Sequence, residues 1–245
     1  MNVPMPSSVA ATASTGAVAA DDQCDVIEAV DQIGDFDAIV TRAGSRYLNS
    51  GIKRTLDILS AGTAVLLLGI CAFPLIALLI KLDSPGPVFY LQRRYGKNGK
   101  VFRCIKFRTM THCPESQTFV QAQKHDSRIT KVGQRLRSSN LDELPQLLNV
   151  LKGDMSLIGP RPHPVELDDN FLRWIPTLMS RYSAKPGLSG LAQVSGQRGE
   201  TRNPREMRNR LRFDYLYIQK ASVALDLKIV TLTIFKMLHG DEKAF

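Results

Sequence analysis

The sequence feature that most constrains the fold is a charge-free apolar run. Residues 64–80 read AVLLLGICAFPLIALLI, seventeen residues without a charged side chain. A helix needs about 20 apolar residues to cross a hydrocarbon core of roughly 30 Å, so this run is barely long enough to span a bilayer. Pro74 lies inside it, and a proline within a helix removes a hydrogen bond and introduces a kink. The run therefore predicts a kinked helix.

Basic residues flank this run on both sides. Lys and Arg accumulate on the cytoplasmic side of a membrane segment, so neither end has the character of a translocated end. A re-entrant helix over residues 50–82, which enters the membrane, breaks near Pro74 and returns to the same face, satisfies this pattern. An ordinary spanning helix and a buried core helix of a soluble protein remain open. The flanking bases are Arg42, Arg46, Lys53 and Arg54 before the run, and Lys81, Arg93, Arg94, Lys97 and Lys100 after it.

Charge divides the chain into two parts. Residues 1–42 contain seven acidic residues and one basic residue, whereas the remainder has 31 basic and 16 acidic residues, a net charge of +15. A body this basic suggests a phosphate-bearing partner, whether nucleic acid, nucleotide or anionic lipid. Residues 1–45 are predicted to be a mostly disordered tail with a short helix near 25–33. The four cysteines show no metal-binding spacing and are interpreted as reduced and cytoplasmic.

Beyond the apolar run, residues 83–245 are expected to form one domain. A short strand within residues 83–92, a turn at Lys97-Asn98-Gly99 and an alternating segment over 101–108 predict a β-hairpin. Residues 111–127 are polar and are expected to form a loop or an exposed helix. Helices are predicted at 129–137, 145–152, 164–182 and 223–238, the last of them amphipathic and lying on the protein or on the membrane surface.

Two adjacent carboxylates, Asp142 and Glu143, directly precede Leu144-Pro145. Because proline favours the first turn of a helix, the pair is expected at a helix N-terminus, where the helix dipole favours negative charge. An ionised carboxylate in this place can serve as a nucleophile or as a metal ligand. Spacing alone favours a structural interpretation, in which Asn140 and Glu143 form a capping box.

Several basic residues around this pair suit phosphate. Arg137 lies five residues before Asp142, Arg161 stands between Pro160 and Pro162, and Lys106 and Arg108 share one face of the expected strand. Arginine binds phosphate oxygens in bidentate geometry. Taken singly, each of these residues is better explained as a solvated charge or an ion-pair partner. The Gly-rich segment 182–201 is typical of a loop in which backbone approaches a ligand closely, or of a plain connection.

Taken together, four blocks resemble the bacterial sugar transferase family, the monotopic polyprenyl-phosphate phosphoglycosyl transferases. The blocks are KRTLDIL (53–59), SPGPVFYLQRRYGKNGKVFRCIKFRTM (84–110), DSRITKVGQRLRSSNLDELPQLLNVLKGDMSLIGPRP (126–162) and KPGLSGLAQVSGQRGET (185–201). The resemblance covers roughly residues 50–245. It implies that Asp142 attacks the β-phosphate of a UDP-sugar, that UMP leaves, and that polyprenyl phosphate then takes the phosphosugar from the aspartyl intermediate.

The resemblance also implies the supporting roles. Glu143, with Asp142, would hold Mg²⁺; Arg137 would bind phosphate; Arg161 with Pro160 and Pro162 would lie near the nucleotide. Lys106 and Arg108 are phosphate or structural contacts. The long C-terminal block is similar to enzymes that start exopolysaccharide chains with a hexose 1-phosphate, glucose first and galactose second. Leu191, where long members of the family commonly carry tryptophan, weakens the transfer of their sugar preference.

The fold implied by the resemblance is α/β and mostly helical. It combines a re-entrant membrane helix-break-helix, amphipathic interfacial helices and a small cytoplasmic catalytic body that contains the β-hairpin. The expected location is the cytoplasmic face of a bacterial inner membrane. The expected partners are a UDP-sugar, undecaprenyl (polyprenyl) phosphate and membrane lipids, without nucleic acid, and homodimerisation is left open. The rival function is a non-catalytic membrane scaffold that binds a nucleotide sugar or anionic lipid.

Overall fold

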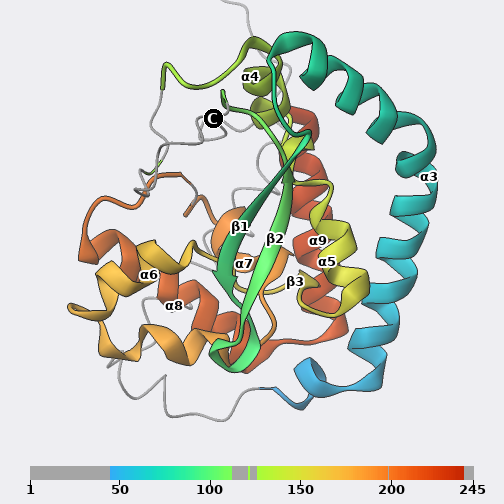
Figure 1. Cartoon of the computed structure of the whole chain (residues 1–245). Helices are drawn as coiled ribbons and strands as arrows, with labels where there is room; N and C mark the ends of the chain where they lie inside the picture. Colours follow the sequence, from blue (N-terminus) through green and yellow to red (C-terminus); the bar gives the residue numbers. More distant parts are fainter. Residues whose placement is uncertain (1–44, 112–120, 122–125, 198, 240–245) are drawn as a thin grey trace, which may run out of the picture.

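The apolar run lies within one long helix, α3 (Gly51–Asp83), in a computed structural model that describes residues 45–111, 121, 126–197 and 199–239. The side-chain oxygen of Ser50 caps its first turn by accepting a hydrogen bond from the Lys53 amide at 3.2 Å. Pro74 lies inside the helix without ending it, because a proline can bend a helix whose remaining hydrogen bonds persist. The expected break is therefore absorbed in a continuous helix, which arches over one side of the molecule (Figure 1).

Both ends of α3 pack on the rest of the protein, whereas its middle is exposed. Near the start, Arg54 donates to two backbone carbonyls of α5 (Gln146–Lys152) at 2.6 and 2.7 Å. Near the end, Ile80 is buried in a small core together with Phe107. Among the described residues, α3 is the one helix that is long and apolar enough to cross a membrane. The most exposed apolar side chains of its middle, at 65–71% exposure, are Leu66, Leu67 and Ile70.

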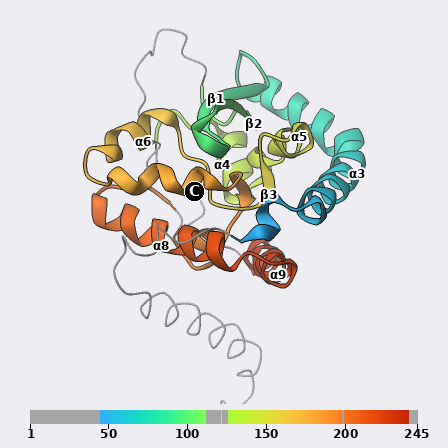
Figure 2. The same ribbon diagram turned by 90° about the horizontal axis from the view of Figure 1, so that it is seen from below.

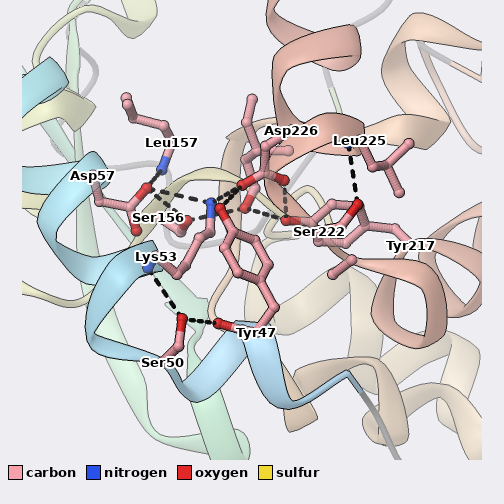
Figure 3. Close-up of polar contacts among 12 residues, drawn as sticks. Tyr47, Ser50, Lys53, Asp57, Ser156, Leu157, Tyr217, Ser222, Leu225 and Asp226 are labelled. Carbon is pink, nitrogen blue, oxygen red and sulfur yellow. Dashed lines mark hydrogen bonds and ion pairs between the residues drawn. The ribbon is translucent and has the colours of Figure 1, made fainter.

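A buried polar network ties the start of α3 to the last described helix, α9 (Val223–His239). The ammonium group of Lys53 lies 3.4 Å from a carboxylate oxygen of Asp57 and 2.7 Å from one of Asp226 (Figure 3). The Tyr217 hydroxyl donates to the second oxygen of Asp226 at 2.8 Å. The position of α3 relative to the C-terminal helix is thus set by charged groups that are largely shielded from water.

The predicted β-hairpin is confirmed. Strands β1 (Phe89–Tyr95) and β2 (Val101–Phe107) pair antiparallel, and the short helix η2 (Lys97–Gly99) joins them. Asn98 adopts the left-handed conformation, with a φ of 57°, that such a tight turn requires. The Asn149 side chain of α5 accepts from the Ile105 amide and donates to the Arg103 carbonyl, so the hairpin rests on that helix.

Within the described residues the structure confirms the predicted helices with one exception, and it adds two α-helices that were not predicted, α7 (Leu191–Val194) and the 17-residue α8 (Pro204–Lys220). The helix expected over 164–182 is divided into α6 (Val165–Leu172) and the 3₁₀ helix η4 (Pro176–Ser183), because Pro176 cannot continue an α-helix. The other elements are η1 (Arg46–Asn49), α4 (Lys131–Ser138), η3 (Leu141–Glu143), β3 (Ser156–Ile158) and β4 (Gly187–Ser189).

The main hydrophobic core lies between α6, η4, α7 and α8, and it includes Leu178, Met207 and Leu211, all fully buried. In the views of Figure 1 and Figure 2, α6 and α8 lie on the opposite side of the molecule from α3. A second core joins the hairpin, α5 and α3 through Phe102, Cys104 and Val150. The molecule therefore has a buried hydrophobic core on one side and a helix with exposed apolar side chains on the other.

Some sequence-based expectations fall outside the described residues. These are the tail over 1–44 with its helix near 25–33, most of the polar segment 111–127, and Cys24 and Cys113. Both described cysteines are free: Cys71 is exposed on α3, and Cys104 is a buried residue of strand β2.

Candidate active site

The two adjacent carboxylates lie in a single 3₁₀ turn, η3, directly before α5, as the sequence predicts. The turn is possible because Asn140 takes a left-handed conformation, with a φ of 58°, and redirects the chain after α4. Both side chains are buried: the residue exposure is 9% for Asp142 and 7% for Glu143. Buried carboxylates are uncommon unless they are paired or functional. Within the described residues, Glu143 is paired with cations, whereas Asp142 is not.

Glu143 is held by two cations. Its Oε1 accepts from Lys106 Nζ at 2.6 Å and from Arg161 Nη2 at 2.5 Å, and its Oε2 accepts from Arg161 Nη1 at 3.0 Å. Burial alone would raise the pKa of Glu143, but Arg161 and Lys106 hold it well below its ordinary value. The capping box favoured by spacing is absent: Asn140 makes no side-chain cap hydrogen bond, and the Glu143 carboxylate is turned toward the two cations.

Asp142 presents a different picture. Within the described part of the chain, its carboxylate accepts no hydrogen bond and forms no ion pair, although it is nearly as buried as Glu143. Burial raises the pKa of Asp142, and the positive charge of Lys106 opposes this rise. A carboxylate that is poorly solvated and unengaged keeps its lone pairs available for a reacting atom. Asp142 is thus the candidate nucleophile, and Glu143 is the anchor of the cations beside it.

Three cations surround these two carboxylates. Lys106 comes from the end of β2, Arg161 from the loop after β3, and Arg137 from the last turn of α4, where its Nε donates to the Thr109 hydroxyl at 2.8 Å. Burial lowers the pKa of Arg137 and raises the pKa of Asp142, and the charge of each group opposes the shift of the other, which places the two in one electrostatic environment. The five side chains carry a net formal charge of +1, a balance that favours an added diphosphate.

The remaining predicted residues lie around this cluster in supporting positions. Pro160 and Pro162 are buried in the loop that carries Arg161; the Pro160 carbonyl accepts from the Gly187 amide at 2.9 Å. Arg108 is directed away from the carboxylates, because its guanidinium donates to the carbonyls of Ile80, Ser84 and Pro85 at the end of α3. Of the two interpretations of Arg108, the structure shows the structural contact.

Sequence reasoning missed the groups that hold the loop of Arg161 in place. Arg94 Nη1 donates to the Pro162 carbonyl at 2.6 Å, and Arg181 Nη2 donates to the Arg161 carbonyl at 2.7 Å. Arg181 is fully buried and paired with Asp214 at 2.7 Å. These arginines are distant in sequence from the loop, and their burial left no signal in composition or spacing.

A buried histidine, His163, contacts Arg181, one of the arginines that hold the loop. His163 contacts Asp168 through Nδ1 at 2.8 Å, and burial, together with the charge of Arg181, lowers its pKa to about 3. The imidazole is therefore neutral at physiological pH, and it lies in contact with two buried charged side chains, Asp168 and Arg181.

Mg²⁺, the metal that the resemblance implies, requires oxygen ligands, which the two carboxylates can supply. Within the described ranges no group of three or more His, Cys, Asp or Glu side chains could hold a metal, so an all-protein cage is absent there. Mg²⁺ needs only one or two carboxylates when substrate phosphates supply other ligands. Asp142 has both oxygens unengaged, and Glu143 Oε2 accepts a single hydrogen bond. This pair fits a cation that is shared with a bound diphosphate.

Comparisons with known proteins show the family to which the chain is related. The profile of a family described as bacterial sugar transferase matches residues 48–240. A UDP-glucose:undecaprenyl-phosphate glucose-1-phosphate transferase of Caulobacter vibrioides is 50% identical over 190 residues, which are 77% of this chain and 70% of that protein. A protein of the same name from Escherichia coli is 47% identical over 77% of this chain and 40% of its own length.

One relative carries a different sugar in its name. A UDP-N-acetylgalactosamine-undecaprenyl-phosphate N-acetylgalactosaminephosphotransferase of Aeromonas hydrophila is 46% identical over 77% of this chain and 44% of its own length. The chain thus spans less than half the length of the E. coli and Aeromonas relatives. Overall similarity is nearly the same for relatives with glucose and with N-acetylgalactosamine in their names.

Proposed function

The chain belongs to the bacterial sugar transferase family, and from this membership and the unengaged carboxylate of Asp142 we propose that it transfers a hexose 1-phosphate from a UDP-sugar to undecaprenyl (polyprenyl) phosphate. Glucose is the first choice of sugar and galactose the second, and the reaction would be the first membrane step in the synthesis of an exopolysaccharide or glycoconjugate. The observation that carries the proposal is the contrast between Glu143, held by two cations, and Asp142, buried beside it without a partner in the described residues.

The proposed reaction has two steps that use the same aspartate. An oxygen of Asp142 attacks the β-phosphorus of the UDP-sugar, the bond from that phosphorus to the bridging oxygen breaks, and UMP leaves with the electron pair. A phosphate oxygen of undecaprenyl phosphate then attacks the phosphorus of the aspartyl-phosphosugar. The aspartyl oxygen–phosphorus bond breaks, and the products are undecaprenyl diphosphosugar and free Asp142. Covalent catalysis splits one difficult transfer into two easier ones.

The surrounding cations are proposed to lower the cost of charge at the reacting phosphates. Lys106 and Arg161 lie next to the dyad and are fixed by Glu143, so they need little reorganisation when a diphosphate binds. Arg137 is proposed as a further phosphate contact, and the loop Pro160–Pro162 as part of the nucleotide site. Mg²⁺ held by Glu143 and Asp142 would neutralise further charge on the diphosphate.

The identity of the sugar is tested with a panel of donors. We expect membranes that contain the protein to release UMP and form lipid-linked product from UDP-glucose, more slowly from UDP-galactose, and least from UDP-N-acetylglucosamine and UDP-N-acetylgalactosamine. The measurement is chromatography of lipid-linked radiolabelled sugar, with membranes that lack the protein as control. Product from the N-acetylated donors alone would refute the hexose assignment while leaving the reaction class intact.

We also propose that α3 is a re-entrant membrane helix and that the catalytic body lies on the cytoplasmic face of a bacterial inner membrane. Both ends of α3 pack on the same body, its middle exposes apolar side chains, and it arches (Figure 1). The helix α9 adds exposed apolar residues that suit a membrane surface: Val223, Leu227, Ile234, Phe235 and Met237. Chemistry on a lipid phosphate requires a site at the depth of the headgroups, which such an anchor provides.

The re-entrant arrangement predicts that both flanks of α3 label from the same side. Single cysteines are introduced at Arg46 and at Lys100, both exposed, in a variant whose four native cysteines are replaced by serine. We expect a membrane-impermeant maleimide to label both positions in inverted inner-membrane vesicles and neither in right-side-out vesicles. Labelling of the two positions from opposite faces would show that α3 crosses the bilayer.

A further inference from the structure

A cavity of about 220 Å³ lies at the N-terminal end of α3, away from the candidate active site. Its walls come from the first turns of α3, the hairpin turn, β3 and the segment before β4. Arg54, which lines it, donates to carbonyls in the last turns of α5, whereas Asp142 and Glu143 precede the first turn of the same helix. The seven residues of α5 extend about 10 Å, so the cavity and the carboxylate pair are separate places.

The cavity is lined by four cationic side chains and a single carboxylate: Lys53, Arg54, Lys97, Lys185 and Asp57. The positive charge of Lys53 is balanced by two carboxylates, because its ammonium group contacts both Asp57 and Asp226 (Figure 3). The other three cations have no acidic partner in the described residues. Arg54 donates to backbone carbonyls and Lys97 to the side-chain oxygen of Asn49, so the acceptors of both cations are neutral groups.

Lys185 is the most telling of these residues. Within the described part of the chain its ammonium group makes no hydrogen bond and no ion pair, yet it is partly buried. A Cβ placed on Gly153 would lie 3.5 Å from Nη2 of Arg54 and 3.8 Å from Nζ of Lys185, so both cations reach the same point. Burial lowers the pKa of Lys185, and the charges of Arg54 and Lys97 lower it further, while those of Asp57 and Asp154 oppose the shift without reversing it. Like charges gathered around one cavity are costly unless an anion neutralises them.

We propose that this cavity binds a phosphate group, and that its occupant is the phosphate headgroup of an anionic membrane lipid. Three cations without acidic partners match a phosphate oxygen cluster, and the cavity is large enough to hold one. The favoured source follows from position: the cavity lies at the base of α3, where Ile52, Leu56 and Leu59 are exposed on the first turns. A headgroup bound there would have acyl chains beside apolar side chains. This inference rests on the membrane placement of α3 and is independent of which sugar is transferred.

The test compares a double variant, Lys97→Gln with Lys185→Gln, against the matched control Lys152→Gln. Lys152 is an exposed lysine at the end of α5, paired with Asp154 at 3.3 Å, and its replacement by glutamine removes one positive charge outside the cavity by the same type of substitution. The full chain is purified in a neutral detergent and titrated with phosphatidylglycerol, with phosphatidylcholine as the reference lipid. Native mass spectrometry counts the bound lipids, and thermal unfolding without lipid checks that each variant is folded.

We expect saturable binding of phosphatidylglycerol that is weakened about a hundredfold in the double variant, since each of the two charged contacts to phosphate contributes on the order of one decade. The Lys152→Gln control should bind within about twofold of the wild type. A Lys106→Gln variant, altered in the candidate active site, should also retain the binding. Equal binding by the wild type and the folded double variant would overturn the proposal.

A parallel titration separates the two sources of phosphate. If the occupant is a lipid headgroup, inorganic phosphate at millimolar concentration should change the melting temperatures of the wild type and of the double variant by the same amount. A phosphate-dependent rise in melting temperature that is confined to chains with Lys97 and Lys185, without selective retention of phosphatidylglycerol, would overturn the lipid assignment in favour of a soluble phosphate. Because these readouts need no turnover, their failure is distinguishable from a failure of the proposed transferase activity.

Discussion

Replacing Asp142 with Asn is expected to lower turnover by a factor on the order of 10⁴ or more while leaving the fold intact. The amide has nearly the shape of the carboxylate but is a poor nucleophile, so the aspartyl-phosphosugar cannot form. No hydrogen bond or ion pair of Asp142 would be lost in the described structure, so stability should change little. The measurement is UMP release from UDP-glucose in the presence of undecaprenyl phosphate.

The same variant tests the covalent intermediate directly. With acceptor lipid omitted, the wild type incubated with UDP-glucose radiolabelled in the sugar should retain label after denaturation, and Asp142→Asn should retain none. Asp154→Asn is the matched control, because Asp154 is a partly exposed carboxylate paired with Lys152 outside the site, and it should label like the wild type. Unchanged polysaccharide output from cells that carry only Asp142→Asn would instead favour the non-catalytic scaffold.

The parts of the fold that could be predicted from sequence are those set by local interactions. The hairpin follows from a turn at Lys97-Asn98-Gly99 between two alternating segments, and its register needs no distant residue. The start of α5 follows from Pro145, and the presence of a long helix at α3 from the charge-free run that forms its second half. In each case the signal and the structure lie within a few residues of each other.

The candidate site was less accessible to the same reasoning, because its contacts are distant in sequence. Spacing favoured a capping box for Glu143, but its partners Lys106 and Arg161 lie 37 and 18 residues away. A salt bridge of this kind outweighs a local cap in a buried place, where an ionised carboxylate needs charged partners. Only the resemblance to a known family directed attention to Asp142 before its surroundings were visible.

The Gly-rich segment was interpreted as a place where backbone approaches a ligand closely, or as a connection. The structure shows close approach to another part of the same chain. Strand β4 pairs in parallel with β3, the Gly159 amide donates to the Ser189 carbonyl at 2.9 Å, and the Gly187 amide donates to the Pro160 carbonyl at 2.9 Å. The partner segment lies about 28 residues earlier in sequence, so no local pattern revealed the pairing.

Replacing Gly187 with Ala is expected to lower stability by about 3 kcal/mol and to reduce activity as well. A Cβ at this position would lie 2.1 Å from the Gly159 amide nitrogen and 2.4 Å from the Ser189 carbonyl oxygen. Both neighbours are backbone atoms that are fixed by strand pairing, so relief requires the segment Gly159–Arg161 to move. Because Arg161 holds Glu143, that movement would also disturb the charges around Asp142.

The effect is measured as the shift in melting temperature, followed by the fluorescence of the single tryptophan, Trp174. For a chain of this size, 1 kcal/mol corresponds to about 2–4 °C, so Gly187→Ala should melt roughly 6–12 °C below the wild type. Gly62→Ala is the matched control: its added methyl meets only a side-chain carbon of Leu151, at 4.0 Å, and alanine favours a helix interior. The control should therefore melt at or slightly above the wild type. If both variants melted together with the wild type, the close packing of Gly159 on Gly187 would be wrong, and Arg161 would need another means of being held beside the carboxylates.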